Sequence, residues 1–337
     1  MNSETDTASA VRGPTVSSKF SKESMIPPQQ EKKKKRAKVF IKDMKKNWRL
    51  HLIAVPVILF FLVFSYFPMV GIVTAFMDYR PTLGIFGSRW VNFDNFAKFV
   101  SDPNFWLALR NTIVMALLNL SFGFFIPVIF ALLLAELRTK WFKRTLEICS
   151  YMPNFVAAVV VCNLVINLLG DNGVITNLFV LFGMERENML ANPNNFWAIN
   201  TAVVLWQGMG YSAIVFTAAI AGVNQDLHEA AVLDGANKLQ RVWHVTLPAI
   251  LPMIVTMFIL RVGLMFSTGF DNILLLYMPM TQEKADVIST FVYRTSVGGG
   301  NDFGYAAAVG LFQSVIATAL LLSSNWLSNK ISKNSLF

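Results

Sequence analysis

Long apolar stretches with few ionised side chains alternate with shorter polar segments along most of the chain. A helix needs about 20 apolar residues to cross a bilayer, and a charge buried in hydrocarbon is costly. Lipid offers no hydrogen bonds to the backbone, so stretches of this length are expected to be helical. They lie between Arg49 and Asp78, Arg110 and Glu136, Glu147 and Asp171, Glu187 and Asp226, Pro248 and Phe270, and Asp302 and Lys330. The pattern predicts an all-α integral membrane protein with six transmembrane helices.

Prolines within these stretches are expected to mark helix ends or kinks, because proline has no backbone N–H to donate. The four in question are Pro56, Pro68, Pro127 and Pro153.

Composition supports a membrane protein, since 54% of the residues are hydrophobic and only 15% are charged, against about 25% charged residues in soluble domains. Most of the net charge of +9 comes from residues 1–49, where 13 basic residues face 5 acidic ones. The rest of the chain is nearly neutral. A basic nucleic-acid-binding domain is therefore excluded as the source of the charge.

Basic residues crowd two polar segments, at 32–49 and at 138–144. Positively charged segments beside a span stay in the cytoplasm. With six spans, Lys330 and Lys333 return to the same side, so both termini are predicted to be inside. The longer segments 78–110, 171–195 and 279–302 are then predicted to face outward.

Residues 1–49 are predicted to form a basic, disordered cytoplasmic tail, followed by a six-helix membrane domain at 50–337. The first apolar run is too long for the core of a signal peptide and is expected to be a retained span. A solvated tail that sets the orientation explains the lysine run, and binding to anionic lipid is the alternative.

Common catalytic and metal-binding patterns are absent from the sequence. There is no Gly-Lys dipeptide, so the phosphate-binding loop of ATPases is excluded. His228-Glu229 resembles the start of a zinc-binding H-E-x-x-H motif, but residue 232 is valine. Cys149 and Cys162, if helical, are about 20 Å apart and cannot bridge. The sequence predicts no metal and no cofactor in this chain.

The polar segment 223–248 between the fourth and fifth spans is long enough to fold on its own. Asn224 can cap a short helix at 225–233, Gly235 permits a turn, and Asn237 can cap a second helix. The apolar side of that second helix would carry Leu239, Val242 and Trp243. The first helix would present a surface of Leu227, Ala230, Ala231 and Leu233. Such a surface is expected to dock into a groove on another protein.

This segment resembles the signature of the permease subunits of binding-protein-dependent ABC importers, which is E-A-A-x-x-x-G followed after nine residues by I-x-L-P. The matching positions are Glu229-Ala230-Ala231, Gly235 and Val245-Thr246-Leu247-Pro248, with Val245 in place of isoleucine. The string EAAVLDGANKLQRVWHVTLPAILP looks like the carbohydrate-uptake branch of the family. The segments 285–294 and 303–316 and the terminal Ser335-Leu336-Phe337 resemble permeases of the aldouronate and alginate type.

The resemblance implies a type I importer fold and a division of labour in a bacterial cell membrane. A second homologous permease, two ATPase subunits that hold ATP and magnesium, and an extracellular solute-binding protein would complete the transporter. This chain would move an oligosaccharide by alternating access and would not itself be an enzyme. Glu229, Ala230, Ala231, Asp234, Gly235, Leu247 and Pro248 would couple it to the ATPase. For Asp234 and Leu247, a purely local role in capping and packing is the alternative.

Three residues of span four are candidates for the sugar path: Trp206, Gln207 and Tyr211. Sugar rings stack on aromatic faces, and hydroxyl groups need amide partners. Packing between subunits is the alternative explanation for the two aromatic residues.

Arg261 is the one ionised side chain inside the fifth stretch. Facing lipid at that depth costs on the order of 3 kcal/mol, so it should face the bundle, a subunit interface or a wet cavity. Asp271 is ten residues further on, about 15 Å along the helix and about 80° around it, so the two side chains cannot pair directly. Arg261 then needs another helix, the second permease, backbone carbonyls or an acidic sugar as its partner.

Two other classes of protein remain as alternatives. An ion-coupled secondary transporter would need carboxylates within the membrane, for which Asp271 is the single candidate. An integral-membrane enzyme would need a cluster of histidines or carboxylates at one membrane face, which the sequence lacks.

Overall fold

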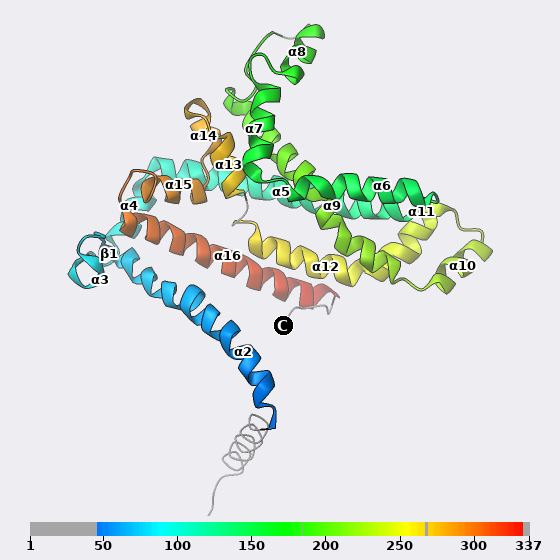
Figure 1. Cartoon of the computed structure of the whole chain (residues 1–337), viewed down its shortest axis with the longest axis horizontal. Helices are drawn as coiled ribbons and strands as arrows, with labels where there is room; N and C mark the ends of the chain where they lie inside the picture. Colours follow the sequence, from blue (N-terminus) through cyan, green and yellow to red (C-terminus); the bar gives the residue numbers. More distant parts are fainter. Residues whose placement is uncertain (1–45, 184, 267–268, 333–337) are drawn as a thin grey trace, which may run out of the picture. The chain divides into compact units, whose positions relative to one another are not determined.

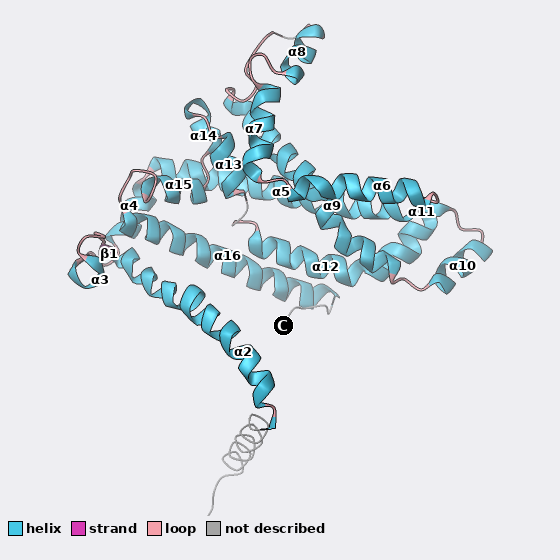
Figure 2. Ribbon diagram, in the orientation of Figure 1, coloured by secondary structure: helices cyan, strands magenta, loops and turns pink. Residues whose placement is uncertain are grey.

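The computed structural model describes residues 46–183, 185–266 and 269–332. Most of these residues are helical, and the sheet they contain pairs two short strands (Figure 1, Figure 2). Six segments of this part of the chain are long and apolar enough to cross a membrane: Leu52–Phe76, Pro103–Ala135, Ala158–Leu181, Pro193–Ala221, Lys238–Leu264 and Phe303–Lys330. The predicted all-α membrane architecture with six spans is confirmed. The chain divides into two compact units, Met1–Met69 and Val70–Phe337.

The first unit contains most of the first span. Helix α2 (Trp48–Phe61) continues into a π-helical turn, η1 (Leu62–Tyr66), and then into a 3-10 helix, η2 (Phe67–Phe76). Pro56 lies inside α2, and Pro68 lies in the first turn of η2, where the hydrogen-bonding pattern changes. The predicted cytoplasmic tail lies outside the described residues, except for its last four positions.

The second unit contains four long helices. They are α5 (Pro103–Ala135), α9 (Phe196–Ala221), α12 (Leu247–Leu264) and α16 (Phe303–Ser332). Helix α5 runs along α9, and α12 runs along α16 (Figure 1). One apolar core joins α5 to α9 through Phe124, Val128, Ala131, Ala213 and Phe216. Because these helices pack along their lengths, they provide a stable frame for the polar groups between them.

The third span, Ala158–Leu181, lies later in the chain than the predicted stretch between Glu147 and Asp171. The chain forms α6 (Lys140–Tyr151), a 3-10 turn η3 (Met152–Phe155), α7 (Ala158–Leu169) and α8 (Val174–Leu181). Pro153 lies in the η3 turn and ends α6, as its lack of an N–H predicts. Between α7 and α8, a Cβ on Gly173 would lie 2.1 Å from the carbonyl oxygen of Leu168, so this turn requires glycine.

The fifth span is also shorter than predicted. Helix α12 ends at Leu264, and a separate helix, α13, covers Phe270–Leu276. Gly269, just before α13, has a φ of 98°, a left-handed value that breaks an α-helix and that glycine adopts at little cost. The prediction of a continuous helix to Phe270 is therefore wrong, and Asp271 belongs to α13 rather than to the end of α12.

Several short elements lie at one end of the long helices. We call this end the outer end. They are β1 (Met77–Asp78) and β2 (Arg89–Trp90), which pair antiparallel, α3 (Gly84–Gly87), α4 (Asp94–Ser101), α14 (Gln282–Ala285) and α15 (Ile288–Thr295). The Asn95 amide donates to the carbonyl oxygens of Ala75 and Met77, and Lys98 forms an ion pair with Asp302. Two of the predicted outward segments, 78–110 and 279–302, thus pack against each other.

Candidate functional site

A polar cavity of about 500 Å³, here called the central cavity, lies among α5, α7, α9, α12 and α13. Its polar lining residues are Asn119, Asn154, Gln207, Tyr211, Ser212, Arg261, Asp271 and Asn272. Glycines at positions 123, 208 and 269 supply part of the wall. Four of the five residues predicted for a sugar path, Gln207, Tyr211, Arg261 and Asp271, are brought together here. Trp206 is not among the lining residues.

Gln207 ties three elements together at one wall of the cavity. Its amide nitrogen donates to the carbonyl oxygen of Val156 at 3.1 Å, where the chain is extended between η3 and α7. Its amide oxygen accepts from Asn272 of α13 at 3.5 Å. Gln207 therefore holds the irregular segment after Pro153, and Asn272 completes a short row of amides along the cavity.

The two aromatic candidates on α9 face different surroundings. Tyr211 lies one turn after Gln207 and lines the cavity, with about half of its surface exposed. Trp206 is exposed to a similar degree but lies outside the lining. Five positions correspond to about 140° around a helix, so the two rings cannot face one ligand together.

Arg261 is half-buried and brings a positive charge to the central cavity. Its Nη2 atom lies 3.3 Å from the point where a Cβ on Gly123 would be, so the guanidinium group rests against the bare backbone of α5. None of the described residues forms an ion pair or a hydrogen bond with this side chain. The cavity therefore holds a cation whose charge the described part of the chain does not neutralise.

Asp271 lines the same cavity because the break at Gly269 redirects the chain into α13. Within the described residues, no ion pair joins it to Arg261. The cavity thus has one cationic and one anionic group, and amides and hydroxyls from α5, η3, α9 and α13 also line it. This mixture suits a polyhydroxylated ligand that carries charge.

Sequence reasoning missed the amides of Asn119, Asn154 and Asn272, which also line the cavity. Asn119 lies in the middle of a predicted span, where burial of an amide in lipid is costly. An asparagine at such a position is the signal that could have indicated an inward-facing polar site.

Two short helices begin in the 223–248 loop where the sequence predicts them. Helix α10 covers Gln225–Leu233, and the Asn224 side chain accepts a hydrogen bond from the N–H of Asp226 at 3.0 Å. Helix α11 covers Lys238–Arg241 and begins with a capping box between Asn237 and Gln240. These contacts satisfy N–H groups that a helix start leaves without partners. The second helix is not separate, because α11 continues through a π-helical turn, η5 (Val242–Thr246), into α12.

The turn between the two helices depends on Gly235, which has a φ of 79°. The N–H of Gly235 donates to the Val232 carbonyl at 3.0 Å, and the N–H of Ala236 donates to the Ala231 carbonyl at 2.9 Å. This pair of bonds is the Schellman motif, which ends a helix with a left-handed residue. Gly235 therefore sets the direction of the chain from α10 to α11.

Most residues predicted to act in coupling are accessible on this loop. Glu229, Ala230, Asp234, Gly235 and Pro248 are exposed, whereas Ala231 and Leu247 are half-buried. Of the expected apolar surface of α10, Leu233 is 88% exposed and Leu227 is 52% exposed. Among the described residues no cluster of metal-binding side chains occurs, and this includes His228-Glu229.

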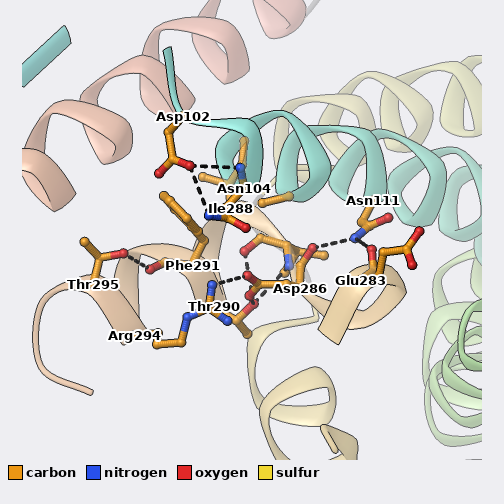
Figure 3. Close-up of polar contacts among 12 residues, drawn as sticks. Asp102, Asn104, Asn111, Glu283, Asp286, Ile288, Thr290, Phe291, Arg294 and Thr295 are labelled. Atoms are coloured by element: carbon orange, nitrogen blue, oxygen red, sulfur yellow. Dashed lines mark hydrogen bonds and ion pairs between the residues drawn. The ribbon is translucent and has the colours of Figure 1, made fainter. Parts of the chain in front are cut away.

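A polar cluster at the outer end was not predicted from the sequence (Figure 3). Asn111 of α5 donates to the carbonyl oxygens of Glu283 and Asp286, both at 2.9 Å. The buried Asp286 carboxylate accepts from Thr290 at 2.8 Å and from Arg294 at 2.5 Å. Burial raises the pKa of Asp286, although the hydroxyl of Thr290 and the charge of Arg294 act in the opposite direction. The cluster fastens α14 and α15 to α5.

In a comparison with known protein families, residues 123–333 match the family described as binding-protein-dependent transport system inner membrane components. The chain is 39% identical over 307 residues to the polygalacturonan/rhamnogalacturonan transport system permease protein YteP of Bacillus subtilis (strain 168), covering 91% of this chain and 95% of that protein. It is 37% identical over 295 residues to protein LplB of the same organism, covering 87% and 92% respectively.

Comparison with solved structures finds the same architecture. A bacterial ABC transporter involved in the import of the acidic polysaccharide alginate contains a chain that matches with a TM-score of 0.81 and 35% identity, over 87% of this chain and 99% of that one. A structure of the bacterial alginate ABC transporter in complex with an alginate pentasaccharide-bound periplasmic protein matches with the same TM-score and identity, over 88% and 99%.

Proposed function

Because the chain belongs to the family of binding-protein-dependent transport system inner membrane components, we propose that it forms half of the membrane pathway of an ATP-driven importer for acidic oligosaccharides. The family is one of ABC transport permeases, which favours this mechanism over ion-coupled transport. The chain itself carries out no hydrolysis in this proposal. ATP and Mg²⁺ are held by two partner ATPase subunits.

The observation that carries the proposal is the Arg261 guanidinium in the central cavity, which has no partner among the described residues. A carboxylate on a sugar unit would accept two parallel hydrogen bonds from it, which is the geometry that arginine favours. The amides of Gln207, Asn272 and Asn119 offer donors and acceptors for hydroxyl groups nearby. The names of similar proteins point the same way, since polygalacturonan and alginate are acidic.

The proposed coupling uses the 223–248 loop. The apolar surface around Leu227, Ala230 and Leu233 has no partner within the described chain and is exposed at the end of the spans. We propose that it docks in a cleft of an ATPase subunit, so that movement of the ATPase reorients the membrane helices. A second homologous permease completes the pathway, and a solute-binding protein delivers the substrate at the outer end. The pathway then opens alternately to the outer side and to the cytoplasmic side of the membrane.

Transport by the reconstituted complex tests the substrate class. The complex should be assembled with Arg261→Gln and with Arg261→Lys, and uptake of an acidic and of a neutral oligosaccharide of equal length should be compared. The glutamine variant is expected to lose uptake of the acidic sugar selectively, and the lysine variant is expected to retain part of it, because charge remains but the planar fork is lost. Equal loss of both sugars, with the complex still assembled, would show that Arg261 has a structural role instead.

A further inference from the structure

A second polar cavity, here called the basic cavity, lies where the 223–248 loop meets the ends of α5 and α9 and the start of α6. It has a volume of about 440 Å³ and is separate from the central cavity. Its ionisable lining residues are Glu136, Arg138, Lys143, His228, Lys238 and Arg241. Four cationic side chains therefore converge on a space that contains one carboxylate.

Within the described residues these charges are poorly balanced. The Nζ atom of Lys238 lies 3.9 Å from the Glu136 carboxylate. Among the described residues, no other ion pair involves any of the charged residues that line the basic cavity. Arg138, Lys143 and Arg241 have no acidic partner in the described part of the chain. The Nε atom of Arg241 is buried and has no hydrogen-bond acceptor. Bringing these cationic groups together is unfavourable, so an anion in this cavity would be bound favourably by the charges that line it.

A long apolar groove adjoins the basic cavity. It has a volume of about 670 Å³ and runs between α5 and the segment from α11 to α12, lined by Ile129, Leu133, Trp243, Leu247, Leu251 and other apolar residues. Two charged residues line it, and they are Glu136 and Lys238, the same pair that lines the basic cavity. The two hollows are therefore adjacent, with one ion pair between them.

We propose that the basic cavity and the apolar groove together bind one anionic phospholipid. The phosphate lies among Arg138, Lys143 and Arg241, and an acyl chain lies in the groove along α5. The groove belongs to two membrane spans, so lipid chains reach it from the bilayer, and positive charge at the cytoplasmic end of a span attracts anionic headgroups. A free phosphate would use the cavity but would leave the groove unexplained.

The site would connect lipid composition to coupling. Lys238 and Arg241 belong to α11, His228 belongs to α10, Arg138 lies in the link between α5 and α6, and Lys143 lies in the first turn of α6. A bound phosphate would therefore hold the loop against the membrane domain. This role is independent of which sugar passes through the central cavity.

Lipid retention by the assembled complex tests the proposal. The full transporter should be extracted from vesicles of phosphatidylglycerol and phosphatidylethanolamine, and retained lipids should be counted by native mass spectrometry. Arg138→Gln combined with Lys143→Gln is expected to lower retention of phosphatidylglycerol by on the order of tenfold, since each basic group near an anionic surface adds measurably to binding. Ile129→Trp, which fills the groove, is expected to have the same effect.

Two control variants keep the test specific. Lys140→Gln combined with Arg144→Gln removes the same charge from exposed positions of α6, outside both hollows. Leu117→Trp adds the same bulk at an exposed position of α5, outside the groove. Both controls should retain phosphatidylglycerol as the unmodified complex does. Equal retention in all variants would overturn the proposal.

Two further outcomes would show that a different molecule occupies the site. If inorganic phosphate displaces the retained anion, and Ile129→Trp has no effect, the cavity takes free phosphate and the lipid assignment is wrong. If Ile129→Trp releases the second permease from the complex, the groove is a subunit contact, and the lipid assignment is again wrong.

Discussion

The Nη2 atom of Arg261, on α12, lies 3.3 Å from the point that a Cβ on Gly123 of α5 would occupy. This approach is tighter than an ordinary van der Waals contact, so the absence of a side chain at position 123 is what lets the guanidinium group reach the wall of the central cavity. The relationship joins two spans whose residues are more than a hundred positions apart.

Gly123 is therefore predicted to control the placement of Arg261. Gly123→Ala should have a small effect, because the end of an arginine side chain can move by a few tenths of an ångström. Gly123→Leu should displace the guanidinium group and reduce uptake of an acidic oligosaccharide as Arg261→Gln does. Gly310→Leu is the matched control, since Gly310 is helical and a Cβ there meets no atom within 4 Å. Normal uptake of the acidic sugar by Gly123→Leu would contradict the prediction.

Gly235 is predicted to be required for coupling because of its left-handed φ of 79°. A Cβ there meets no atom within 4 Å, so the cost of substitution is backbone strain alone. Gly235→Val should strain the turn by about 1–2 kcal/mol or more and reduce substrate-stimulated ATP hydrolysis. Gly235→Asn should retain most activity, because asparagine tolerates this conformation.

The assay for this prediction is ATP hydrolysis by the purified complex with and without loaded binding protein. Gly222→Ala, at the end of α9 with an ordinary φ, is the control at a neighbouring loop position. Unchanged stimulation in Gly235→Val or in Gly235→Pro would remove this turn from the proposed coupling path.

Gly210 is predicted to be a stability determinant of the membrane domain. A Cβ on Gly210 would lie 2.1 Å from the carbonyl oxygen of Ser150, so α9 packs directly on the backbone of α6. Gly210→Ala should force the helices apart at a cost of about 1–3 kcal/mol and lower the unfolding temperature of the complex in detergent. Gly208→Ala, two residues earlier with open space at its Cβ, should leave that temperature unchanged.

The buried Asp286 is predicted to make the stability of the outer end depend on pH. Burial raises its pKa above the ordinary value of 3.8, so the folded state holds the proton more tightly than the unfolded chain. The contribution of Asp286 to stability should be full below about pH 3.8 and should decrease as the pH rises through the folded pKa. Thermal unfolding between pH 4 and pH 7 measures this.

Two variants separate Asp286 from the other acidic groups. Asp286→Asn should remove its part of the pH dependence. Arg294→Gln should enlarge it, because the Arg294 guanidinium group at 2.5 Å favours the ionised carboxylate. Identical pH profiles for all three proteins would show that Asp286 does not titrate differently in the folded state.

The topology predicts which cysteine variants an impermeant thiol reagent labels in intact cells. Ser88 lies in a segment that is predicted to face outward, but it is buried, so exposed neighbours are better sites. Phe86→Cys, Asn194→Cys and Val297→Cys should be labelled, since their positions are exposed in the three outward segments. Leu233→Cys, which is exposed on α10, should react only after permeabilisation. Cys149 and Cys162 are replaced beforehand. Labelling of Leu233→Cys in intact cells would reverse the orientation.

Local patterns of the sequence determined the number of spans and the turns of the 223–248 loop, but not the bounds of the third and fifth spans. Hydropathy identifies a membrane span without information about the neighbouring helices, because the bilayer acts on each apolar segment separately. Asn224 and Asn237 cap helices within three residues of themselves, and Gly235 turns the chain by its own φ. Predictions that depend on such short-range contacts agree with the structure.

Only the tertiary structure decided how the central cavity is built. Arg261 and Asp271 face one space because α12 ends at Leu264 and Gly269 starts a new helix, whereas hydropathy alone continues the helix to Phe270. Gln207 is held at the cavity wall by hydrogen bonds with Val156 and Asn272, which are distant from it in sequence. The walls of this cavity come from helices that pack through close contacts, such as Gly210 on Ser150, and no local pattern of the sequence encodes which helices meet.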